Sequence, residues 1–541
     1  MGGIPRLLRM QARRDRWQLL IWIVGVGLVT LGSGAATATE FGGEKERTAL
    51  VLLATHNHAI LMLRGAPQGI GVGGLMFFEL FAFLAVMAGL MSTFLIVRHT
   101  RGEEEAGRGE LVAAAPVTRV ATLVSAVLLA LIANLLLVAV IAGAFIASGF
   151  DPAGSIVTGL AAGSAGVSFA GIATVAAQLT QTSRAANAIA GSSVGVAYLV
   201  RGIGDALGTA SSDGLSVTSA WPSWLSPIGW GQQTHAFSQN SLAPLGLSVS
   251  LAVVLVACAL WIRTRRDIGA SLFAERVGRE RASVVLRSSF GLAWRLHWPT
   301  VAGWAVGGAV VGGFAGSLGP VVADAVAGNA SISKAIAGLV PGGGGSADLQ
   351  DVFVAAMLGI TGFLAAGAGV QAVLRMRDEE TAGRAEPVLA TSIDRGVWLI
   401  HYVVVAAISV LAVALVAGLV CGVTLLASGA GGDRFWGALA AGFAQWPAAF
   451  LYVGLIALVF AVVPRLTVSL GWGLLAVGLV IGQLGSLLRL PDWVRDVSPF
   501  SHTPSVPVAA FDWTSAVILA AIGLVLTAGA AITLRTRDLV T

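Results

Sequence analysis

The sequence predicts an all-α polytopic membrane protein with about twelve transmembrane helices in two tandem six-helix repeats. Three observations support this prediction: an apolar composition, long apolar stretches along the whole chain, and a charged motif that occurs twice. Of the 541 residues, 56% are hydrophobic and only 11% are charged, whereas roughly a quarter of the residues of soluble domains are charged. The mean hydropathy of +0.84 agrees with this. The composition therefore indicates an integral membrane protein.

Apolar stretches of about 20 residues or more can cross a bilayer as helices. The alternating pattern of an outer-membrane barrel does not occur in them. The expected spans are residues 18–37, 70–97, 119–148, 154–180, 186–206 and 243–262 in the first half, and residues 299–318, 351–374, 397–427, 436–463, 467–487 and 514–534 in the second.

Polar segments between the spans define three regions. The first half, residues 1–262, contains a basic interfacial helix at 4–17, an external segment at 38–69, a charged segment at 98–118 and an external, partly re-entrant element at 207–242. Residues 263–297 form a basic cytoplasmic linker that includes a second interfacial helix. The second half, residues 298–541, contains an external segment at 319–350, a charged segment at 375–396 and an external element at 488–513.

The two charged segments share a motif, and we name them the first island (residues 98–118) and the second island (residues 375–396). Glu103-Glu104-Glu105-Ala106-Gly107-Arg108-Gly109-Glu110 matches Glu379-Glu380-Thr381-Ala382-Gly383-Arg384-Ala385-Glu386, 276 positions later. Ser226-Pro227 likewise matches Ser498-Pro499, and Arg263-Thr264-Arg265 matches Arg535-Thr536-Arg537. These matches indicate a tandem duplication. Each copy has an even number of spans, so we expect a pseudo-twofold axis along the membrane normal.

The distribution of basic residues predicts the orientation. With the N-terminus inside, most of the 33 Lys and Arg residues lie on the cytoplasmic side, as the positive-inside rule requires. The exceptions are Lys45, Arg47, Arg64, Arg201, Lys334, Arg434, Arg489 and Arg495. Both termini and both islands are therefore expected to be cytoplasmic, in a chain that lies in a bacterial inner (cytoplasmic) membrane.

Several function classes are disfavoured by the residue inventory. Neither Lys45 nor Lys334 lies in a P-loop motif, so the chain is not itself a P-loop ATPase. The two cysteines, Cys258 and Cys421, lie in apolar runs, where a small buried side chain is expected. The pair His56-x-His58 lacks a third metal ligand nearby, so no metal site is expected. The arginines follow the topology and do not gather with aromatic residues, so nucleic acid is not an expected partner.

The glutamates of the islands call for another explanation, because carboxylates contribute little to membrane orientation. Adjacent acids suit the N-terminus of a helix, where the free amides and the helix dipole favour negative charge. A short helix of this kind, lying across the ends of two spans, would present carboxylates to a basic soluble partner. The alternative is that these are solvated loop charges; the shared spacing of the two copies favours docking.

The duplicated islands, the external Ser-Pro elements and the repeated six-span unit resemble those of actinobacterial ABC exporter permeases for polyketide antibiotics, the tetronasin and multidrug group. The resemblance covers essentially the whole chain. It implies the ABC type-2 exporter (type V-like) fold, in which a short cytoplasmic coupling helix between the second and third spans of each unit fits a cleft on an ATPase subunit. It also implies no cofactor in this chain, since a separate pair of cytoplasmic ABC ATPase subunits binds ATP and Mg.

The resemblance places the ATPase contacts on the islands. The implied contact residues are Glu103, Glu104, Glu105, Gly107, Arg108 and Glu110 in the first island, and Glu379, Glu380, Gly383, Arg384 and Glu386 in the second. The second copy departs from the first at Thr381 and Pro387, which stand where the first has Glu105 and Leu111. These departures leave open whether the two contacts are equivalent.

Polar residues within spans are candidates for the substrate path or gate, because burying them in a membrane is costly. Arg201 and Asp205 are one helical turn apart and can form a local ion pair or part of an external gate. Glu79 is the only carboxylate well inside a span; it could meet Arg201 across the bundle or bind a cationic drug. Gln445 and Trp446 precede Pro447 and mark an expected kink.

Glycines within the spans form a further group. Gly163, Gly166 and Gly442 are expected to allow close helix approach at the interface of the two halves.

These features predict the permease of an ATP-driven exporter that moves amphiphilic small molecules, such as antibiotics, drugs or lipid-like compounds, out of the cell by alternating access. The chain itself would not be an enzyme, and membrane lipid would be a further partner. One alternative is an ion-coupled secondary multidrug transporter, for which Glu79 is the one candidate proton carrier. Another is an enzyme acting on lipid-linked sugar, but His99 and His401 lack a suitable set of partners.

Overall fold

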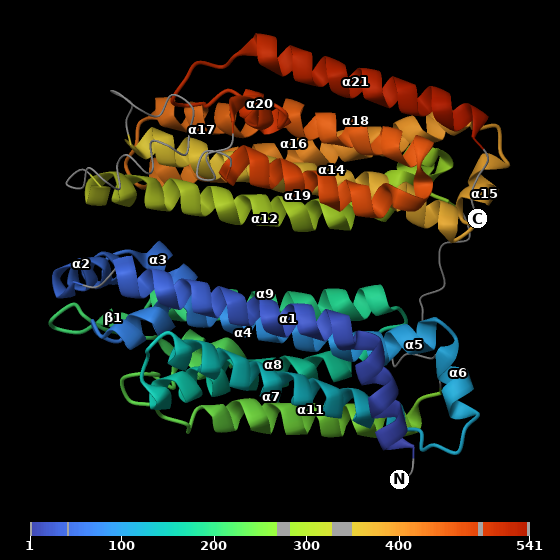
Figure 1. The fold of residues 1–541 in the computed structure, drawn as a ribbon. Helices are drawn as coiled ribbons and strands as arrows, with labels where there is room; N and C mark the ends of the chain where they lie inside the picture. The colour runs from blue at the N-terminus through green and yellow to red at the C-terminus, as the bar shows by residue number, and fades with distance from the viewer. Residues whose placement is uncertain (1–2, 41–42, 268–281, 327–348, 485–490, 538–541) are drawn as a thin grey trace. The chain divides into compact units, whose positions relative to one another are not determined.

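The computed structural model describes residues 3–40, 43–267, 282–326, 349–484 and 491–537. It forms two compact units, Met1–Val277 and Gly278–Thr541, and the boundary between them lies in the basic linker. Both units are almost entirely helical (Figure 1). The prediction of an all-α polytopic membrane protein is confirmed.

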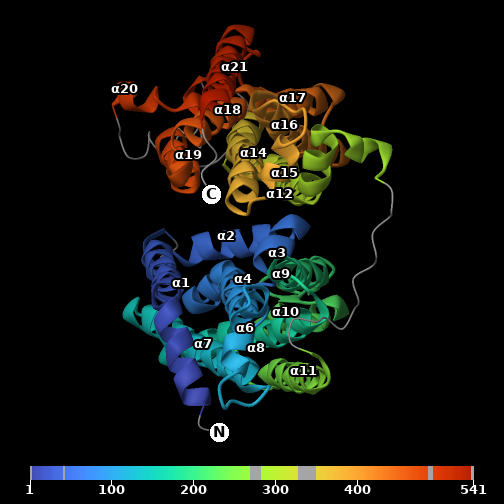
Figure 2. The ribbon, with the colours of Figure 1, turned by 90° about the vertical axis from the view of Figure 1, so that its right-hand side faces the viewer.

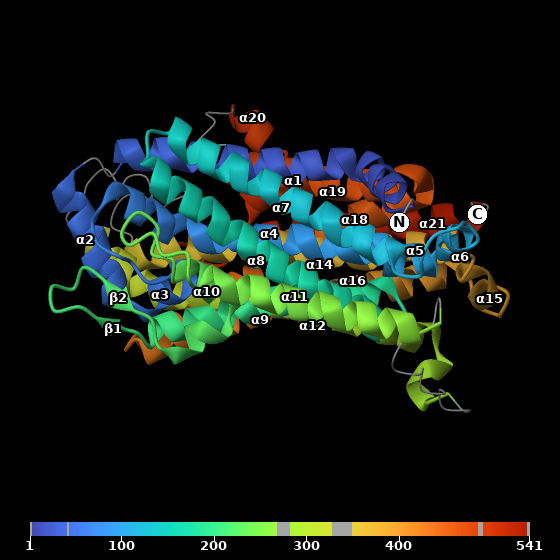
Figure 3. The ribbon, with the colours of Figure 1, turned by 90° about the horizontal axis from the view of Figure 1, so that it is seen from below.

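The first unit contains six long helices and several short elements. They are α1 (Ile4–Glu40), α2 (Glu44–Thr55), α3 (His58–Arg64), α4 (Val72–His99), α5 (Arg101–Glu105), α6 (Arg108–Ala113), α7 (Ala121–Ala147), α8 (Pro152–Leu179), α9 (Ser183–Ala206), β1 (Thr209–Ala210), β2 (Val217–Thr218), the 3-10 helix η1 (Trp221–Leu225), α10 (Pro227–Gln232) and α11 (Leu245–Arg265). The island helices α5 and α6 lie at one end of this unit, and α2, α3 and the β1–β2 pair lie at the other (Figure 1, Figure 3).

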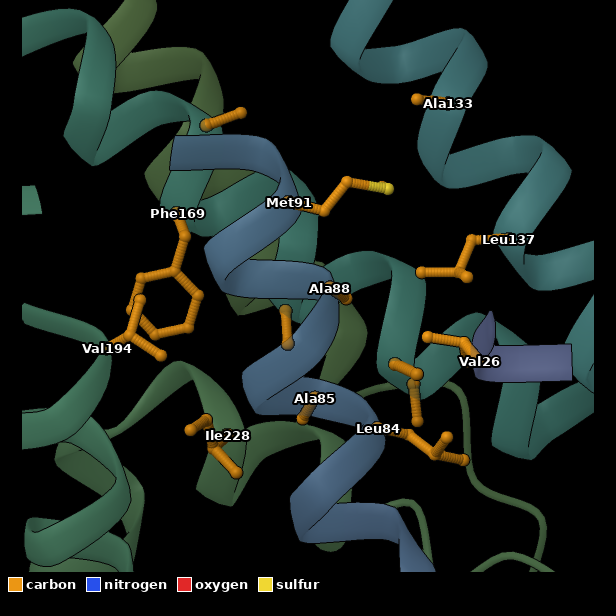
Figure 4. Packing of buried hydrophobic residues seen from close by; sticks show 14 of the residues in the cluster. Val26, Leu84, Ala85, Ala88, Met91, Ala133, Leu137, Phe169, Val194 and Ile228 are labelled. Atoms are coloured by element: carbon orange, nitrogen blue, oxygen red, sulfur yellow. The ribbon is translucent and has the colours of Figure 1, made fainter. Parts of the chain in front are cut away.

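Helix α4 is the central element of the first unit. It packs against α1, α7, α8 and α9, which surround it in the end-on view of Figure 2. Its sequence is apolar on almost every face, as is typical of a helix that is buried on all sides. Figure 4 shows Leu84, Ala85, Ala88 and Met91 of α4 facing side chains of the neighbouring helices, among them Phe169.

Small residues set the distance between these helices. A Cβ on Gly166 would lie 1.9 Å from Asn134 Oδ1 of α7, and one on Gly163 would lie 2.4 Å from Val138 Cγ2. Gly442 approaches Ala414 and its neighbours in the same way within the second unit. The expected role of these glycines in close packing is confirmed, but their expected place between the halves is wrong. Each of them packs inside its own unit.

The second unit is also built mainly of long helices. It contains η2 (Val284–Arg287), α12 (Ser289–Val326), α14 (Leu349–Thr381), α15 (Ala385–Leu389), α16 (Arg395–Ala427), α17 (Gly432–Ala444), α18 (Trp446–Val462), η3 (Pro464–Leu466), α19 (Thr467–Leu484), α20 (Asp492–Arg495), η4 (Pro499–His502) and α21 (Trp513–Thr536). The external segment expected at 319–350 lies mostly outside the described residues, as do the first residues of the element expected at 488–513.

Eleven helices in the described ranges are long and apolar enough to cross a membrane. The expected number was twelve. The difference is α9, which forms a helix at the position expected for the fifth span but carries more polar residues than the others, including Asn187, Arg201 and Asp205.

Two expected boundaries are wrong. The interfacial helix at 4–17 and the first span are one continuous helix, α1, whose first turns bend in Figure 1. Helix α12 likewise joins an interfacial segment and a span. No proline or glycine interrupts residues 6–24 of α1, so the helical hydrogen bonds continue from the basic segment into the apolar one.

The external element at 207–242 folds back onto the helices of the first unit. Residues 209–218 form a small antiparallel β-ribbon that the sequence did not indicate, with Thr209 paired to Thr218. Helix α10 then packs against α8 and α9 and buries Ile228 completely. A Cβ on Gly231 would meet the ring of Phe81 at 2.5 Å, so this position has room only for glycine.

We expect Gly166→Leu to separate α7 from α8 and to lower the free energy of unfolding by about 1–3 kcal/mol, because an added side chain has no space there. Thermal unfolding of the purified protein in detergent measures this effect. The matched control is Gly143→Ala on α7, where nothing lies within 4 Å of the added Cβ and where alanine favours the helix. Equal melting temperatures for the two variants would contradict the packing argument.

Candidate functional site

Both islands are built around the same helix-ending turn. Gly107 and Gly383 have φ values of +70° and +67°, a left-handed conformation that glycine adopts without strain. The Gly107 amide donates to the Glu104 carbonyl at 3.0 Å, and the Gly383 amide donates to the Glu380 carbonyl at 3.0 Å. The repeated Ala-Gly therefore marks the point where each helix stops and the chain reverses into α6 or α15.

Glu104 is buried and surrounded by arginines. Its side chain is 7% exposed and forms ion pairs with Arg101 at 2.9 Å, with Arg266 at 2.8 Å and with Arg263. Burial lowers the pKa of the Arg266 guanidinium, and the Glu104 carboxylate opposes this shift. Arg263 lies in the last turn of α11, and Arg266 is the first residue after the end of this helix. Glu104 therefore ties the first island to the final helix of the first unit.

Glu380 occupies the equivalent position in the second unit. Its side chain is 1% exposed and pairs with Arg377 at 3.1 Å and with Arg537, just beyond α21. Arg101 and Arg377 each stand three residues before their glutamate. The second island is therefore tied to the final helix of its own unit by the same device.

Glu103 and Glu379 hold the turn closed from the other side. Arg108 donates to both carboxylate oxygens of Glu103, at 2.7 and 3.2 Å. Arg384 does the same to Glu379, at 2.8 and 3.3 Å. Hydrogen bonding to Glu379 raises the pKa of the Arg384 guanidinium, and Glu103 raises that of Arg108 in the same way. Within the Glu-Glu-x-Ala-Gly-Arg motif, the ion pair between the first glutamate and the arginine thus stabilises the turn.

Glu105 caps another helix. Its carboxylate accepts hydrogen bonds from the Ser183 amide at 2.8 Å and the Ser183 hydroxyl at 2.5 Å, at the first turn of α9. A carboxylate there satisfies a free amide and interacts favourably with the helix dipole. Thr381, at the same position in the second island, instead donates its hydroxyl to the Arg377 carbonyl at 2.9 Å. This explains the departure of the second copy from the first.

The expected placement of the acids at helix N-termini is wrong for the second island. Glu379 and Glu380 lie in the last turn of α14, where the helix dipole disfavours negative charge. Glu103 and Glu104 do lie in the first turn of the five-residue α5. Arginine pairing replaces the helix dipole as the interaction that stabilises the carboxylates of the second island.

The short helices α6 and α15 contain much of the exposed surface of the islands. Glu110 and Glu386 are exposed, and within the described ranges neither forms an ion pair. Leu111 of α6 is 75% exposed and adds an apolar side chain to this surface. Whether the islands contact an ATPase remains a prediction, but their available surface is α6 and α15 and not Glu104 or Glu380.

Glu79 lines a cavity of the first unit. This cavity has a volume of about 490 Å³ and mostly apolar walls from α1, α3, α4 and α9, including Phe83 and Tyr198. Glu79 forms an ion pair with Arg64. Of the two expected partners of Glu79, Arg201 is therefore wrong, and a cationic drug stays a prediction. Arg64 comes from α3, a helix within the segment at 38–69 that we expected to be external.

Arg201 and Asp205 form a fully buried ion pair at 3.0 Å, as the one-turn spacing predicted. Arg201 also donates to the Met62 carbonyl at 3.1 Å, and Asp205 accepts from Ser219 at 2.6 Å and from Gln232 at 3.0 Å. These bonds join α9 to α3 and to the external element. The ion pair therefore helps to hold these elements together. Its role in a gate stays a prediction.

The kink expected at Gln445 and Trp446 is confirmed. Helix α17 ends at Ala444 and α18 begins at Trp446. The indole of Trp446 donates to the Ala407 carbonyl at 3.3 Å and stacks on Phe450, and both rings line an apolar cavity of about 320 Å³ in the second unit.

Sequence reasoning missed three interacting groups. Arg64 was placed outside the bundle, Arg101 was not singled out, and the buried contact between His99 and Asp15, at 2.8 Å, was not anticipated. Arg101 could have been found, because Arg377 repeats its spacing from the second glutamate. The other two join segments far apart in the sequence.

The fold, the apolar cavities within it and the repeated polar ends define a multi-pass membrane permease. Over 99% of its length the chain is 32% identical to the multidrug efflux system permease protein Rv1217c of Mycobacterium tuberculosis strain H37Rv, of which 95% is covered. A family model described as the C-terminal domain of the multidrug efflux system permease Rv1217c matches residues 286–535. The chain belongs to this family of multidrug efflux system permeases.

We expect Glu104→Ala to lower the free energy of unfolding by about 3–5 kcal/mol, because it leaves the surrounding arginines buried without a counter-charge. Glu380→Ala should act in the same direction. The control is Glu110→Ala, an exposed change that should stay within about 0.5 kcal/mol of the wild type. Melting curves in detergent compare the three; a harmless Glu104→Ala would refute the fastening role of this side chain.

Proposed function

We propose that the chain is the transmembrane subunit of an ATP-driven ABC exporter for amphiphilic small molecules, such as antibiotics, drugs or lipid-like compounds. Two copies of a separate cytoplasmic ATPase bind ATP and Mg and drive it. The observation that carries the proposal is the pair of matching islands, each joined by a buried carboxylate to the last helix of its unit. Membership of a multidrug efflux permease family supports the export of drug-like compounds.

The islands are suited to transmit motion. Helices α6 and α15 offer exposed surface, while Glu104 and Glu380 join the same segments to α11 and α21 through ion pairs. A force applied to the exposed helices therefore acts on two long helices of each unit at once, α4 and α11 in the first and α14 and α21 in the second. In this proposal the ATPase subunits contact α6 and α15, both islands and both termini lie in the cytoplasm, and the units tilt to give alternating access.

The cavities fit an amphiphilic substrate. The cavity beside Glu79 combines a volume of about 490 Å³, aromatic and aliphatic walls and one carboxylate. Pockets of this size and composition bind drug-sized molecules. The carboxylate of Glu79 gives the site a preference for cationic amphiphiles that displace Arg64, whose side chain is 42% exposed.

A secondary, ion-coupled multidrug transporter is the second candidate, because Glu79 lies in a cavity where it could carry a proton. The ion pair with Arg64 disfavours this role, because the Arg64 guanidinium already occupies the carboxylate as its partner.

The decisive experiment reconstitutes the chain with a candidate ABC ATPase subunit. We expect drug-stimulated ATP hydrolysis that falls about tenfold or more in the double variant Glu110→Lys/Glu386→Lys, because reversing two exposed charges on the contact helices weakens docking. The control Glu44→Lys reverses an exposed charge on α2, at the far end of the first unit, and should leave hydrolysis unchanged. Transport by the chain alone, driven by a proton gradient, would replace this proposal with the secondary-transporter alternative.

We further expect Glu79→Gln to weaken binding of cationic amphiphiles about tenfold while sparing neutral ones, because it removes one charge from the cavity wall. Equilibrium binding of a fluorescent cationic dye and of an uncharged analogue measures the difference. Phe83→Ala serves as the comparison, since it should weaken both ligands alike by removing apolar contact. Equal losses for both ligands with Glu79→Gln would argue against charge recognition.

A further inference from the structure

Each island borders a cavity, and the two cavities occupy corresponding positions in their units. The first is lined by the start of α1, the end of α4, α6 and the start of α7. The second is lined by the start of α12, the end of α14, α15 and the start of α16. Aligning Trp22 with Trp304 and Glu103 with Glu379 superimposes their wall residues. In that alignment Arg14 corresponds to Leu296, His99 to Arg375, and Thr122 to Trp398.

The two cavities differ greatly in size. The first has a volume of about 30 Å³ and the second about 370 Å³. The first is closed by its own polar side chains: Asp15 contacts His99 at 2.8 Å, and Arg14 reaches across to Glu103. The same alignment puts His297 at the position of Asp15. The second unit therefore lacks the acid–histidine contact that closes the first cavity.

Arg375 leaves positive charge on the wall of the larger cavity. Its side chain is 13% exposed and lies 2.8 Å from Glu379, its one ion-pair partner among the described residues. Glu379 is already held by Arg384 through both oxygens. Two guanidinium groups thus share one carboxylate, and the remaining Arg375 N–H groups can donate to an anion.

Apart from Glu379 and Ser289, the other walls of this cavity are mostly apolar. Leu292, Leu296, Val388, Trp398 and Tyr402 line it beside the two arginines. Helices α12, α14 and α16, which supply most of these residues, are apolar enough to cross a membrane. The cavity therefore combines anion-binding groups with a surface suited to a hydrocarbon chain, at the ends of spanning helices. A soluble anion would make no use of the apolar walls.

We propose that this cavity binds an acidic phospholipid, with the phosphate against Arg375 and Arg384 and the start of an acyl chain against Leu292 and Leu296. Acidic headgroups are attracted to basic groups at the membrane surface, and basic pockets between spanning helices hold them. A volume of about 370 Å³ is within the range of small-ligand pockets. That the lipid comes from the cytoplasmic leaflet rests on the proposed function; the binding itself does not.

The test is native mass spectrometry of the full chain in detergent, titrated with phosphatidylglycerol and, in parallel, with phosphatidylcholine. We expect one tightly held phosphatidylglycerol in the wild type and about tenfold weaker binding in Arg375→His, which installs the residue of the closed cavity, because a charge-assisted hydrogen bond is lost. Val388→Phe should also weaken binding, by filling the cavity without changing its charge. Arg295→Ala, an exposed arginine on α12 that does not line the cavity, should bind as the wild type does.

Three results would overturn the proposal. The first is equal affinity for the two lipids, and the second is unchanged binding in both Arg375→His and Val388→Phe. The third is competition by inorganic phosphate at concentrations equal to those of the lipid, which would identify a site for soluble anions. None of these measurements involves an ATPase, so this proposal and the proposed transport function can fail independently.

Discussion

The structure depends on a carboxylate buried among arginines at one end of each unit. The side chains of Glu104 and Glu380 are withdrawn from water, and their charge is compensated by guanidinium groups. These belong to Arg101, Arg263 and Arg266 in one unit, and to Arg377 and Arg537 in the other. Such an arrangement tolerates no loss of a partner, because an unpaired buried charge is far less stable than a pair. The end of one helix, the island and the last helix of the unit consequently move together.

This constraint explains why the motif is so similar in both halves. The glycine in the left-handed conformation reverses the chain, and the arginine after it donates hydrogen bonds to the first glutamate. The second glutamate forms an ion pair with an arginine at the end of the final helix. The two glutamates and the arginine that begin and end Glu-Glu-x-Ala-Gly-Arg therefore each have an ion-pair partner within their own unit. A permease that passes motion from a soluble partner to its membrane helices needs a rigid part of this kind, with a variable exposed surface beside it.

The cavities of the two units differ, because this constraint does not act on them. The first contains the Glu79 cavity and a closed pocket under its island, whereas the second contains an apolar cavity beside Trp446 and an open pocket beside Arg375. Ala355 stands where Glu79 would be repeated. The two units therefore share the ion pairs that join their helices but differ in their cavities, so that one chain has two chemically distinct interiors.

The sequence by itself determined the helical membrane class and the local contacts, while the tandem duplication stays an interpretation of its repeated motifs. Arg201 and Asp205 could be matched because one turn of helix fixes their separation, and the break at Gln445 follows from a proline without an amide hydrogen. Only the tertiary structure decided that Glu79 meets Arg64 and that Glu104 meets Arg263. These contacts join residues on different helices, and helix packing, which depends on the shapes of many small side chains at once, decides which polar groups face one another.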